Sequence, residues 1–222
     1  MTTSDLKLLF HTDAQGQSAS FLDVIDDGLE GTLDERIPAL LVLLHSPEGP
    51  PSLKAAVMLI SWGHPEALQA VRRWSLQPDS APWARQSITK QRHSGADGSW
   101  SLIADALRTS QYASLRPGLD TDRLSALRSL LRLTVSEDFD RSLATTIASI
   151  PGAAEHLADA LDEAIEGLIS AAPSEPFDRI FQAALLSKEL ARARPERAHA
   201  LAQQIAAQAP SPRAQRELSD LL

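Results

Sequence analysis

Four carboxylates recur at helical spacing in the second half of the chain, and hydrolases use paired carboxylates as acid and base. They are Glu155, Asp159, Asp162 and Glu166, at spacings of 4, 3 and 4 residues. This spacing puts all of them on one helical face, and a wholly polar face is typical of solvent exposure rather than of the burial that a general acid needs. We therefore expect either a solvated face paired with Arg128 and Arg132, or an acidic docking stripe for a basic partner.

A second acidic group occupies the polar face of a helix expected from about Ser18 to Glu30. Its members are Asp23, Asp26, Asp27 and Glu30. The expected apolar stripe of this helix consists of Phe21, Leu22, Ile25 and Leu29, and the helix is expected to fray at Gly28 and Gly31. This group is the other candidate contact for a basic partner.

All four Trp residues fall between positions 62 and 100, and several Arg residues lie among them. Trp and Arg are the usual anchors of protein interfaces, and they can also stack on RNA bases. Trp62 and Trp74 lie on apolar stripes, so we expect them in the core. Trp83 and Trp100 flank an irregular stretch and are expected to be freer for recognition. The acidic flanking segments count against an RNA-binding role.

Other catalytic and metal-binding patterns are missing from the sequence. It contains no Cys, no His-Glu-x-x-His, no Gly-x-Ser-x-Gly and no phosphate-binding loop that ends in Lys-Ser or Lys-Thr. The six His residues are dispersed, and no two of them are spaced four apart on a helix. We therefore predict no catalytic residue, no metal site and no cofactor.

Composition predicts an all-α fold. Of the 222 residues, 34 are Ala and 34 are Leu, whereas only 5 are Val and 1 is Tyr, and Ala and Leu are the strongest helix formers. The longest apolar run, 37–44, is far shorter than the roughly 20 residues of a membrane span. With no secretory signal pattern at residues 1–10, we expect a cytoplasmic protein without a membrane partner.

Charge is distributed unevenly along the chain. The formal net charge is −8, which argues against general nucleic-acid binding because such a surface must replace phosphate counterions. Residues 1–65 hold 9 acidic and 3 basic side chains, whereas residues 66–135 hold 6 and 10. Residues 136–178 hold 10 acidic and 1 basic side chain, and residues 179–222 hold 4 and 7. This alternation indicates segments that complement one another, a partner, or both.

Amphipathic helices separated by short Pro, Gly or Ser breaks are expected over most of residues 1–222, which we treat as one helical-repeat domain with an irregular loop at about 77–99. A proline-rich break is expected at 46–51, with Ser52 capping the next helix. Candidate hairpins begin roughly 27 to 41 residues apart, and short connections make consecutive helices antiparallel neighbours. This spacing predicts an α-solenoid, in which stacked hairpins cover each other's apolar faces. A non-repetitive helical bundle is the alternative.

The segment Leu53–Leu68, which reads LKAAVMLISWGHPEAL, resembles the junction between two HEAT-type repeats. The resemblance rests on its Ala-rich helix, its Gly and its Pro-Glu-Ala-Leu turn, and it covers about 40 residues. Beyond them only the spacing of the helices is similar, apart from a weak match to the turn at Pro195–Ala198. HEAT and armadillo-like proteins imply a right-handed solenoid, here of about five irregular hairpins.

Such a solenoid is expected to bind another protein without catalysis. Small, acidic, Cys-free bacterial proteins of this architecture resemble immunity proteins, which neutralise a cognate toxin. This resemblance implies a basic toxin as the partner, occluded by one of the two acidic groups. Two alternatives remain open: an adaptor or assembly chaperone of an endogenous complex, and a HEAT-like enzyme such as a DNA-alkylation glycosylase that uses the basic stretch 66–135.

Overall fold

The computed structural model describes residues 2–84, 86, 97–113, 119–171, 177–208 and 210–222. Within these residues the chain is all-α, with twelve α-helices, three 3-10 turns and no β-strand. The helices are α1 (Thr3–Phe10), α2 (Phe21–Leu29), α3 (Ile37–Leu44), α4 (Gly49–Ser61), α5 (Pro65–Leu76), α6 (Ser99–Thr109), α7 (Leu119–Leu131), α8 (Ser142–Ser149), α9 (Ala153–Ser170), α10 (Arg179–Ala193), α11 (Pro195–Ala206) and α12 (Pro212–Leu218). The 3-10 turns are η1 (Asp34–Arg36), η2 (Pro78–Ser80) and η3 (Ser110–Tyr112).

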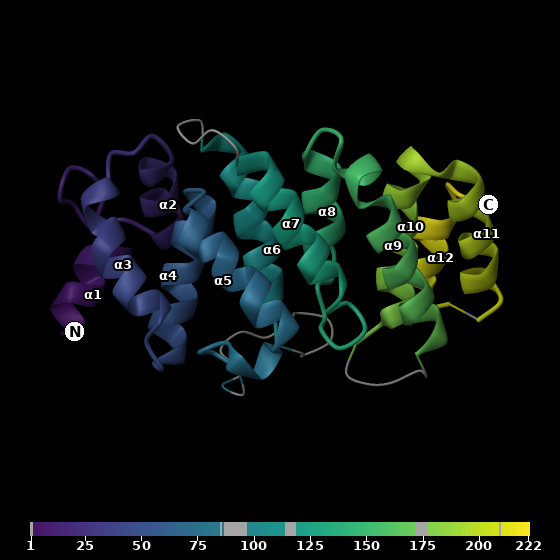
Figure 1. Cartoon of the computed structure of the whole chain (residues 1–222), viewed down its shortest axis with the longest axis horizontal. Helices are drawn as coiled ribbons and strands as arrows, with labels where there is room; N and C mark the ends of the chain where they lie inside the picture. The colour runs from purple at the N-terminus through teal and green to yellow at the C-terminus, as the bar shows by residue number, and fades with distance from the viewer. Residues whose placement is uncertain (1, 85, 87–96, 114–118, 172–176, 209) are drawn as a thin grey trace.

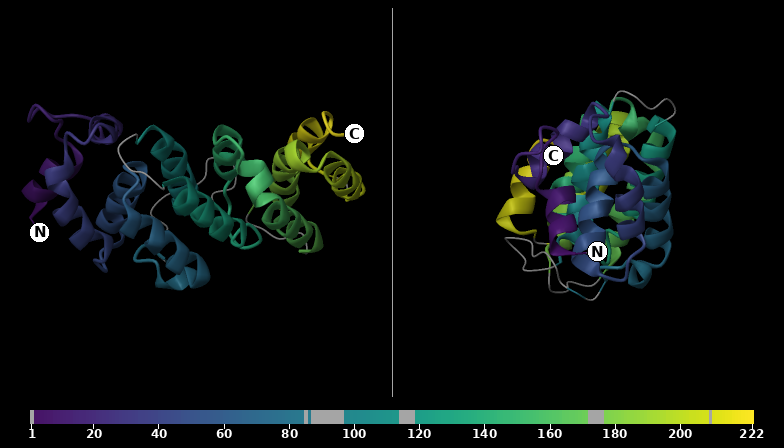
Figure 2. Two further views of the ribbon diagram at one scale, coloured as in Figure 1. Left: turned by 45° about the horizontal axis from the view of Figure 1, so that its top comes forward. Right: turned by 90° about the vertical axis from the view of Figure 1, so that its left-hand side faces the viewer.

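The helices follow one another along a single long axis, with the N-terminus at one end and the C-terminus at the other (Figure 1). Most helices pack against the next helix but one. In one row α4 packs on α6, α6 on α8, α8 on α10 and α10 on α12; in the other, α5 packs on α7, α7 on α9 and α9 on α11. The two rows form an elongated double layer (Figure 2). This packing is consistent with a helical solenoid, as the spacing predicts.

The junction between α4 and α5 forms as the sequence predicts. Gly63 adopts a left-handed conformation with φ of +68°, and its N–H bonds the carbonyl of Ile60. The N–H of His64 bonds the carbonyl of Leu59 over 2.8 Å, which completes a Schellman ending to α4. Pro65 then begins α5, where a missing N–H has no cost. The two helices therefore reverse direction within a few residues.

The start of α4 corrects the sequence prediction. The helix begins at Gly49 and contains both Pro50 and Pro51, because prolines fit the first helical turn, where backbone N–H groups have no partner inside the helix. Ser52 is therefore inside the helix and is not its cap; its hydroxyl donates to the carbonyl of Leu44 over 3.0 Å. The predicted break is thus shorter, and α3 and α4 form a tight antiparallel pair.

Two further boundaries differ from the sequence prediction. The first helix, α1, is not predicted, although Thr2 and Asp5 form a capping box at its start. At the other end of the chain, the amphipathic pattern of residues 211–222 predicts one helix, but α12 ends at Leu218. Within the irregular stretch expected at about 77–99, the structure describes residues 77–84, 86 and 97–99, which include η2; a short helix that the sequence also predicts at 83–91 falls mostly outside the described residues.

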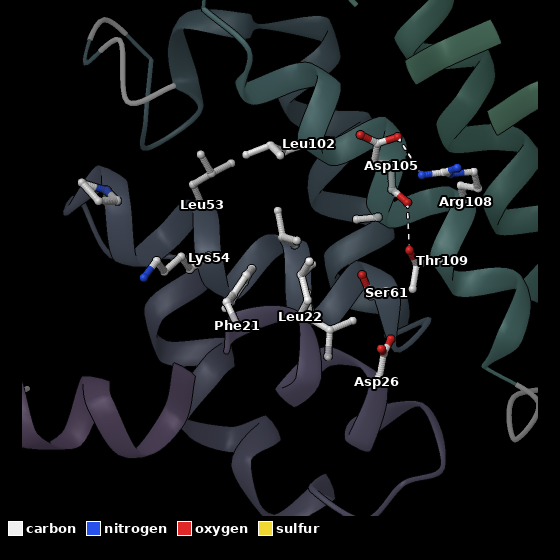
Figure 3. A pocket seen from close by; sticks show the side chains of 14 residues that line it. Phe21, Leu22, Asp26, Leu53, Lys54, Ser61, Leu102, Asp105, Arg108 and Thr109 are labelled. Carbon is white, nitrogen blue, oxygen red and sulfur yellow. Dashed lines mark hydrogen bonds and ion pairs between the residues drawn. The ribbon is translucent and has the colours of Figure 1, made fainter. Parts of the chain in front are cut away.

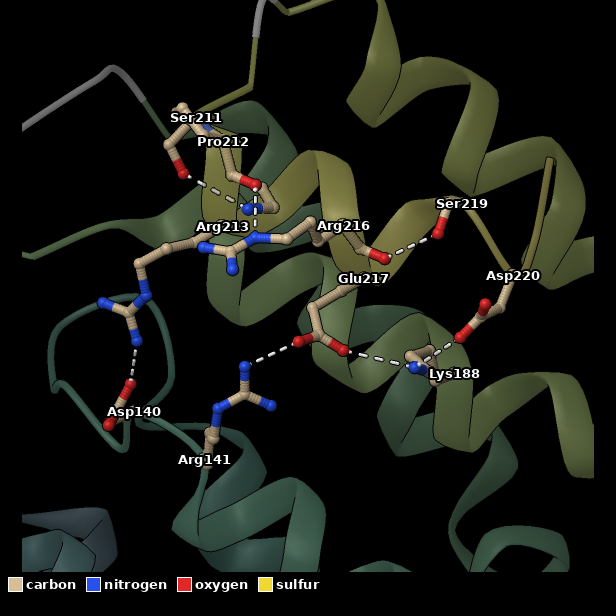
Figure 4. Close-up of polar contacts among 11 residues, drawn as sticks. Asp140, Arg141, Lys188, Ser211, Pro212, Arg213, Arg216, Glu217, Ser219 and Asp220 are labelled. Atoms are coloured by element: carbon tan, nitrogen blue, oxygen red, sulfur yellow. Dashed lines mark hydrogen bonds and ion pairs between the residues drawn. The ribbon is translucent and has the colours of Figure 1, made fainter.

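The C-terminal helix α12 closes the array by ion pairs to two preceding elements (Figure 4). Glu217 accepts from Arg141, just before α8, over 2.6 Å and from Lys188 of α10 over 3.2 Å. Lys188 also donates to Asp220 over 2.9 Å. Both bases together hold the pKa of Glu217 below its usual value, despite the opposing effect of its burial.

Candidate protein-binding groove

The acidic stripe on α9 is paired within the chain. Arg194, which precedes α11, donates to Asp159 over 2.5 Å. Arg197, in the first turn of α11, donates from Nε to both carboxylate oxygens of Asp162 over 2.9 and 3.0 Å, and it also bonds Glu166. Three of the four stripe carboxylates therefore already face guanidinium groups. The fourth, Glu155, is exposed.

The expected pairing of this stripe with α7 is wrong. Arg128 donates instead to the backbone carbonyl of His156 over 2.7 Å, and Arg132 is exposed. Both arginines and the side chains of Asp159 and Glu163 line a polar cleft between α7 and α9, but no ion pair joins them in the described residues. The arginines that bind the stripe are Arg194 and Arg197, at the start of α11, each 35 residues further along the sequence than its aspartate.

The acidic group on α2 divides into two pairs. Asp23 forms a capping box with Ser20, whose hydroxyl and N–H both hold the pKa of Asp23 below its usual value. Asp27 accepts from the N–H of Ala14 over 3.0 Å and ties down the preceding loop. Asp26 and Glu30 are exposed, and neither side chain has a hydrogen bond or ion pair within the described residues. Two carboxylates of this group are thus free to meet a partner.

Trp83 and Trp100 lie in the core, so the prediction that they are available for recognition is wrong. Trp83 is 1% exposed and Trp100 is 4% exposed. The rings of Trp74, Trp83 and Trp100 stack edge to face, with centroid distances of 4.7 and 6.1 Å. Edge-to-face packing of this kind stabilises a buried cluster. The irregular stretch thus contributes a core residue on each side.

An apolar groove lies between α2, α4 and α6, with a volume of about 410 Å³ (Figure 3). Its centre is apolar and its ends are charged. The lining residues are Phe21, Leu22, Ile25 and Asp26 of α2; Pro50, Leu53, Lys54, Val57 and Ser61 of α4; and Leu102, Asp105, Ala106, Arg108 and Thr109 of α6. Grooves of this size with an apolar centre are typical binding sites.

Two leucines of the groove are exposed to solvent. Leu22 is 69% exposed, whereas Val24, two residues further along, is fully buried, so the predicted apolar stripe of α2 is wrong at this position. Ile25 is buried and lines the groove, and Leu22 remains at its mouth. Leu102 of α6 is 38% exposed. Exposed leucines around one cavity are the feature expected of a surface that a partner covers.

A close packing contact positions α2 as one wall of the groove. Gly28 lies against the indole ring of Trp62, where a Cβ atom would come within 2.0 Å of Cε2. The indole Nε1 donates to the carbonyl of Ile25 over 2.9 Å. Gly28 is therefore a buried contact inside α2, and the prediction of a frayed end there is wrong. The glycine lets the helix approach α4 closely enough to form the groove.

Charged groups stand at both ends of the groove. Burial raises the pKa of Asp105, against the opposing effects of a hydrogen bond from Ser142 over 3.1 Å and of Arg108. The Arg108 guanidinium is 3.4 Å from Asp105, longer than the 2.7–2.9 Å of a strong charge-assisted bond. At the other end the Lys54 ammonium lies over the rings of Phe10 and Phe21, at 5.5 and 5.6 Å.

Sequence reasoning identified Asp26 in this groove but missed its other two walls. The signals were present as helical spacing: residues 50, 53, 54, 57 and 61 form one stripe of α4, and 102, 105, 106 and 109 form one stripe of α6. Helical spacing places each set of residues on one face of its helix, but only the packing of the three helices brings these faces together around one groove.

In the described part of the chain, no three His, Asp or Glu side chains converge in a way that could hold a metal ion. None of the described helices has the length and apolar character needed to span a bilayer. Comparison with protein-family models, curated proteins and solved structures finds no match for this chain. The geometry of the groove is suited to holding a ligand through apolar contact, with charges that orient it.

Proposed function

We propose that this chain is a non-catalytic protein-binding helical-repeat protein that docks its partner in the groove between α2, α4 and α6. The observation that carries the proposal is the apolar lining of the groove, at whose mouth Leu22 is 69% exposed. Burying such a side chain contributes about 1.5–3 kcal/mol, so a partner gains free energy by covering it. In architecture, we propose a right-handed solenoid of about five irregular HEAT-like hairpins, acting in the cytoplasm.

We further propose that the partner is basic, and that it is a toxin which this protein neutralises by occlusion. The support is the charge of the N-terminal quarter, where residues 1–65 hold 9 acidic and 3 basic side chains. Asp26 is the carboxylate of α2 that lines the groove, and it has no ion pair or hydrogen bond among the described residues. The α9 stripe contributes less to this proposal, because Arg194 and Arg197 already neutralise most of it. An adaptor of an endogenous complex would use the same surface with a constitutive partner.

The test is affinity capture on the immobilised full chain from a lysate of the source cells, read by mass spectrometry. We expect one stoichiometric partner with a basic surface, and we expect about 0.5 M NaCl to release much of it because screening weakens charge pairing. Leu22→Glu should lose the partner. Leu76→Glu is the matched control, because Leu76 is 67% exposed on α5 and lies outside the groove.

Three results would contradict the proposal. Absence of any stoichiometric partner would contradict the protein-binding function. Equal capture by Leu22→Glu and by wild type would contradict the assignment of the groove as the binding site. A partner with an acidic surface that stays bound in high salt would contradict only the proposal that the partner is a basic toxin. If a basic partner is captured, coexpression with it should relieve its toxicity only when the groove is intact.

A further inference from the structure

The groove has the dimensions of a short helical ligand. Its floor on α4 runs from Pro50 to Ser61, 11 steps along the helix, which at 1.5 Å per step is about 16 Å. Leucines on all three walls surround this length: Leu22 from α2, Leu53 from α4 and Leu102 from α6 (Figure 3). About three helical turns would cover the floor, and side chains at positions i, i+3 or i+4, and i+7 would reach all three leucines.

Backbone chemistry favours a helix over an extended peptide. The walls are helices, whose interior N–H and C=O groups are bonded within each helix, so they offer no ladder for a strand to join. An extended segment laid over Leu22, Leu53 and Leu102 would bury its own N–H and C=O groups against carbon atoms. A buried group without a partner loses the hydrogen bonds that it made to water, which opposes binding. A helix satisfies these groups internally and presents only side chains to the groove.

Charge at the groove distinguishes its two ends. Asp26 and Asp105 stand at the end where Ser61 and Thr109 lie, and Lys54 stands at the other (Figure 3). Asp26 has no ion pair or hydrogen bond among the described residues, whereas Asp105 is paired with Arg108 at 3.4 Å and accepts a hydrogen bond from Ser142 over 3.1 Å. The α2 wall contains three aspartates and no basic residue. A cation at this end of the ligand would meet the unpaired carboxylate of Asp26.

We infer that the groove receives an amphipathic helix of the partner, about three turns long, with its apolar stripe on the exposed Leu22 and Leu102 and a Lys or Arg at one end beside Asp26. The inference rests on the proposed function and specifies the element of the partner that docks. The basic end sets the direction in which the helix lies, and the apolar stripe supplies most of the contact area.

The test uses phage-displayed peptides of about 15 residues, long enough to reach marginal helicity alone. Peptides are selected for binding to the full chain, and those that also bind Leu22→Glu are discarded. Peptides are kept only if they still bind Leu76→Glu. We expect the selected peptides to share an apolar i, i+3 or i+4, i+7 stripe and a Lys or Arg at one end. Their dissociation constants are then measured by fluorescence anisotropy against Asp26→Lys and against Glu30→Lys.

Asp26→Lys should weaken binding by about tenfold, because it replaces an attraction by a repulsion, and a peptide with Glu at its basic end should recover affinity for this variant. Glu30→Lys makes the same change of charge on α2, outside the groove lining, and should change affinity by less than about twofold, since exposed charges at a distance are screened. This charge swap assigns the basic end of the peptide to Asp26.

Four results would overturn the inference. They are selected peptides without helical spacing, selected peptides without a basic end, equal affinity for the two charge variants, and a wild-type chain that is dimeric in sedimentation while Leu22→Glu is monomeric. The last result would identify a second copy of this chain as the occupant. If lysate capture retains a partner while any of these results is found, the inference fails and the proposed function stands. If capture finds no partner, the proposed function fails by itself.

Discussion

The guanidinium of Arg197 on α11 bonds both carboxylate oxygens of Asp162 on α9, over 2.9 and 3.0 Å. It thus joins two helices between which the whole of α10 lies in the sequence. Arg197 also contacts Glu166, one turn further along α9. The acidic stripe that resembles a docking surface in the sequence is therefore a contact within the fold. A basic partner would have to compete with an arginine that is already in place.

Arg197→Ala should destabilise the protein by less than about 1 kcal/mol, because partly exposed ion pairs contribute little. Urea denaturation measures this change, and Arg72→Ala is the control, since Arg72 is exposed without a partner in the described residues. Partner capture should be unchanged in the Arg197 variant. Stronger capture would instead indicate that the α9 stripe binds the partner once its internal arginine is removed.

Gly28→Ala should destabilise the protein although Ala is the better helix former. The new methyl group would lie 2.0 Å from the indole Cε2 of Trp62, and overpacking of this kind costs about 1–3 kcal/mol. The gain in helix propensity is only about 1 kcal/mol. Gly167→Ala on α9 is the control, because its Cβ would meet only a methyl of Val135 at 3.1 Å. A Gly28 variant at least as stable as wild type would show that α2 does not need this close approach.

Arg123→Met should be strongly destabilising, because Arg123 is buried and its guanidinium satisfies the turn after α6. Nε donates to the hydroxyl of Ser110 over 2.9 Å, and Nη2 donates to its carbonyl over 2.8 Å. Each buried acceptor left unpaired costs about 1–3 kcal/mol. Thermal and urea unfolding measure the loss, and Arg132→Met, just after the end of the same helix, is the control, since Arg132 is exposed. Equal stability of the two variants would mean that water replaces the guanidinium.

Glu137 should make the protein less stable as pH rises from about 4.5 to about 7. Burial raises the pKa of Glu137 from 4.5 to about 7, and the negative charges of Asp97 and Asp79 act in the same direction. The folded state therefore holds this proton more tightly than the unfolded chain, so ionisation favours unfolding over that interval. Glu137→Gln removes the titration, and it should be more stabilising at pH 8 than at pH 5. Denaturation at both values measures the difference, and an equal effect at both would contradict the raised pKa.

The α4–α5 junction could be predicted from sequence because its determinants are local. Gly63 supplies the left-handed residue and Pro65 the first helical position, whatever packs around them. The same rules failed at Pro50 and Pro51, because consecutive prolines are compatible with either a break or a first turn. Here α4 already begins at Gly49, so Ser52 lies within its first turns and not at the capping position before it, and its hydroxyl donates to the carbonyl of Leu44.

The amino-acid sequence by itself determined the all-α class and the approximate position of most helices, because helix propensity and apolar periodicity act within a few neighbouring residues. Only the tertiary structure decided which stripes are covered. A stripe such as that of α2 fits more than one rotation about its axis, and Gly28 against Trp62 selects the one that exposes Leu22. The tertiary structure also decided that, among the described residues, Asp162 is paired with an arginine and Asp26 is not, since whether a carboxylate meets an arginine depends on which distant helix is its neighbour.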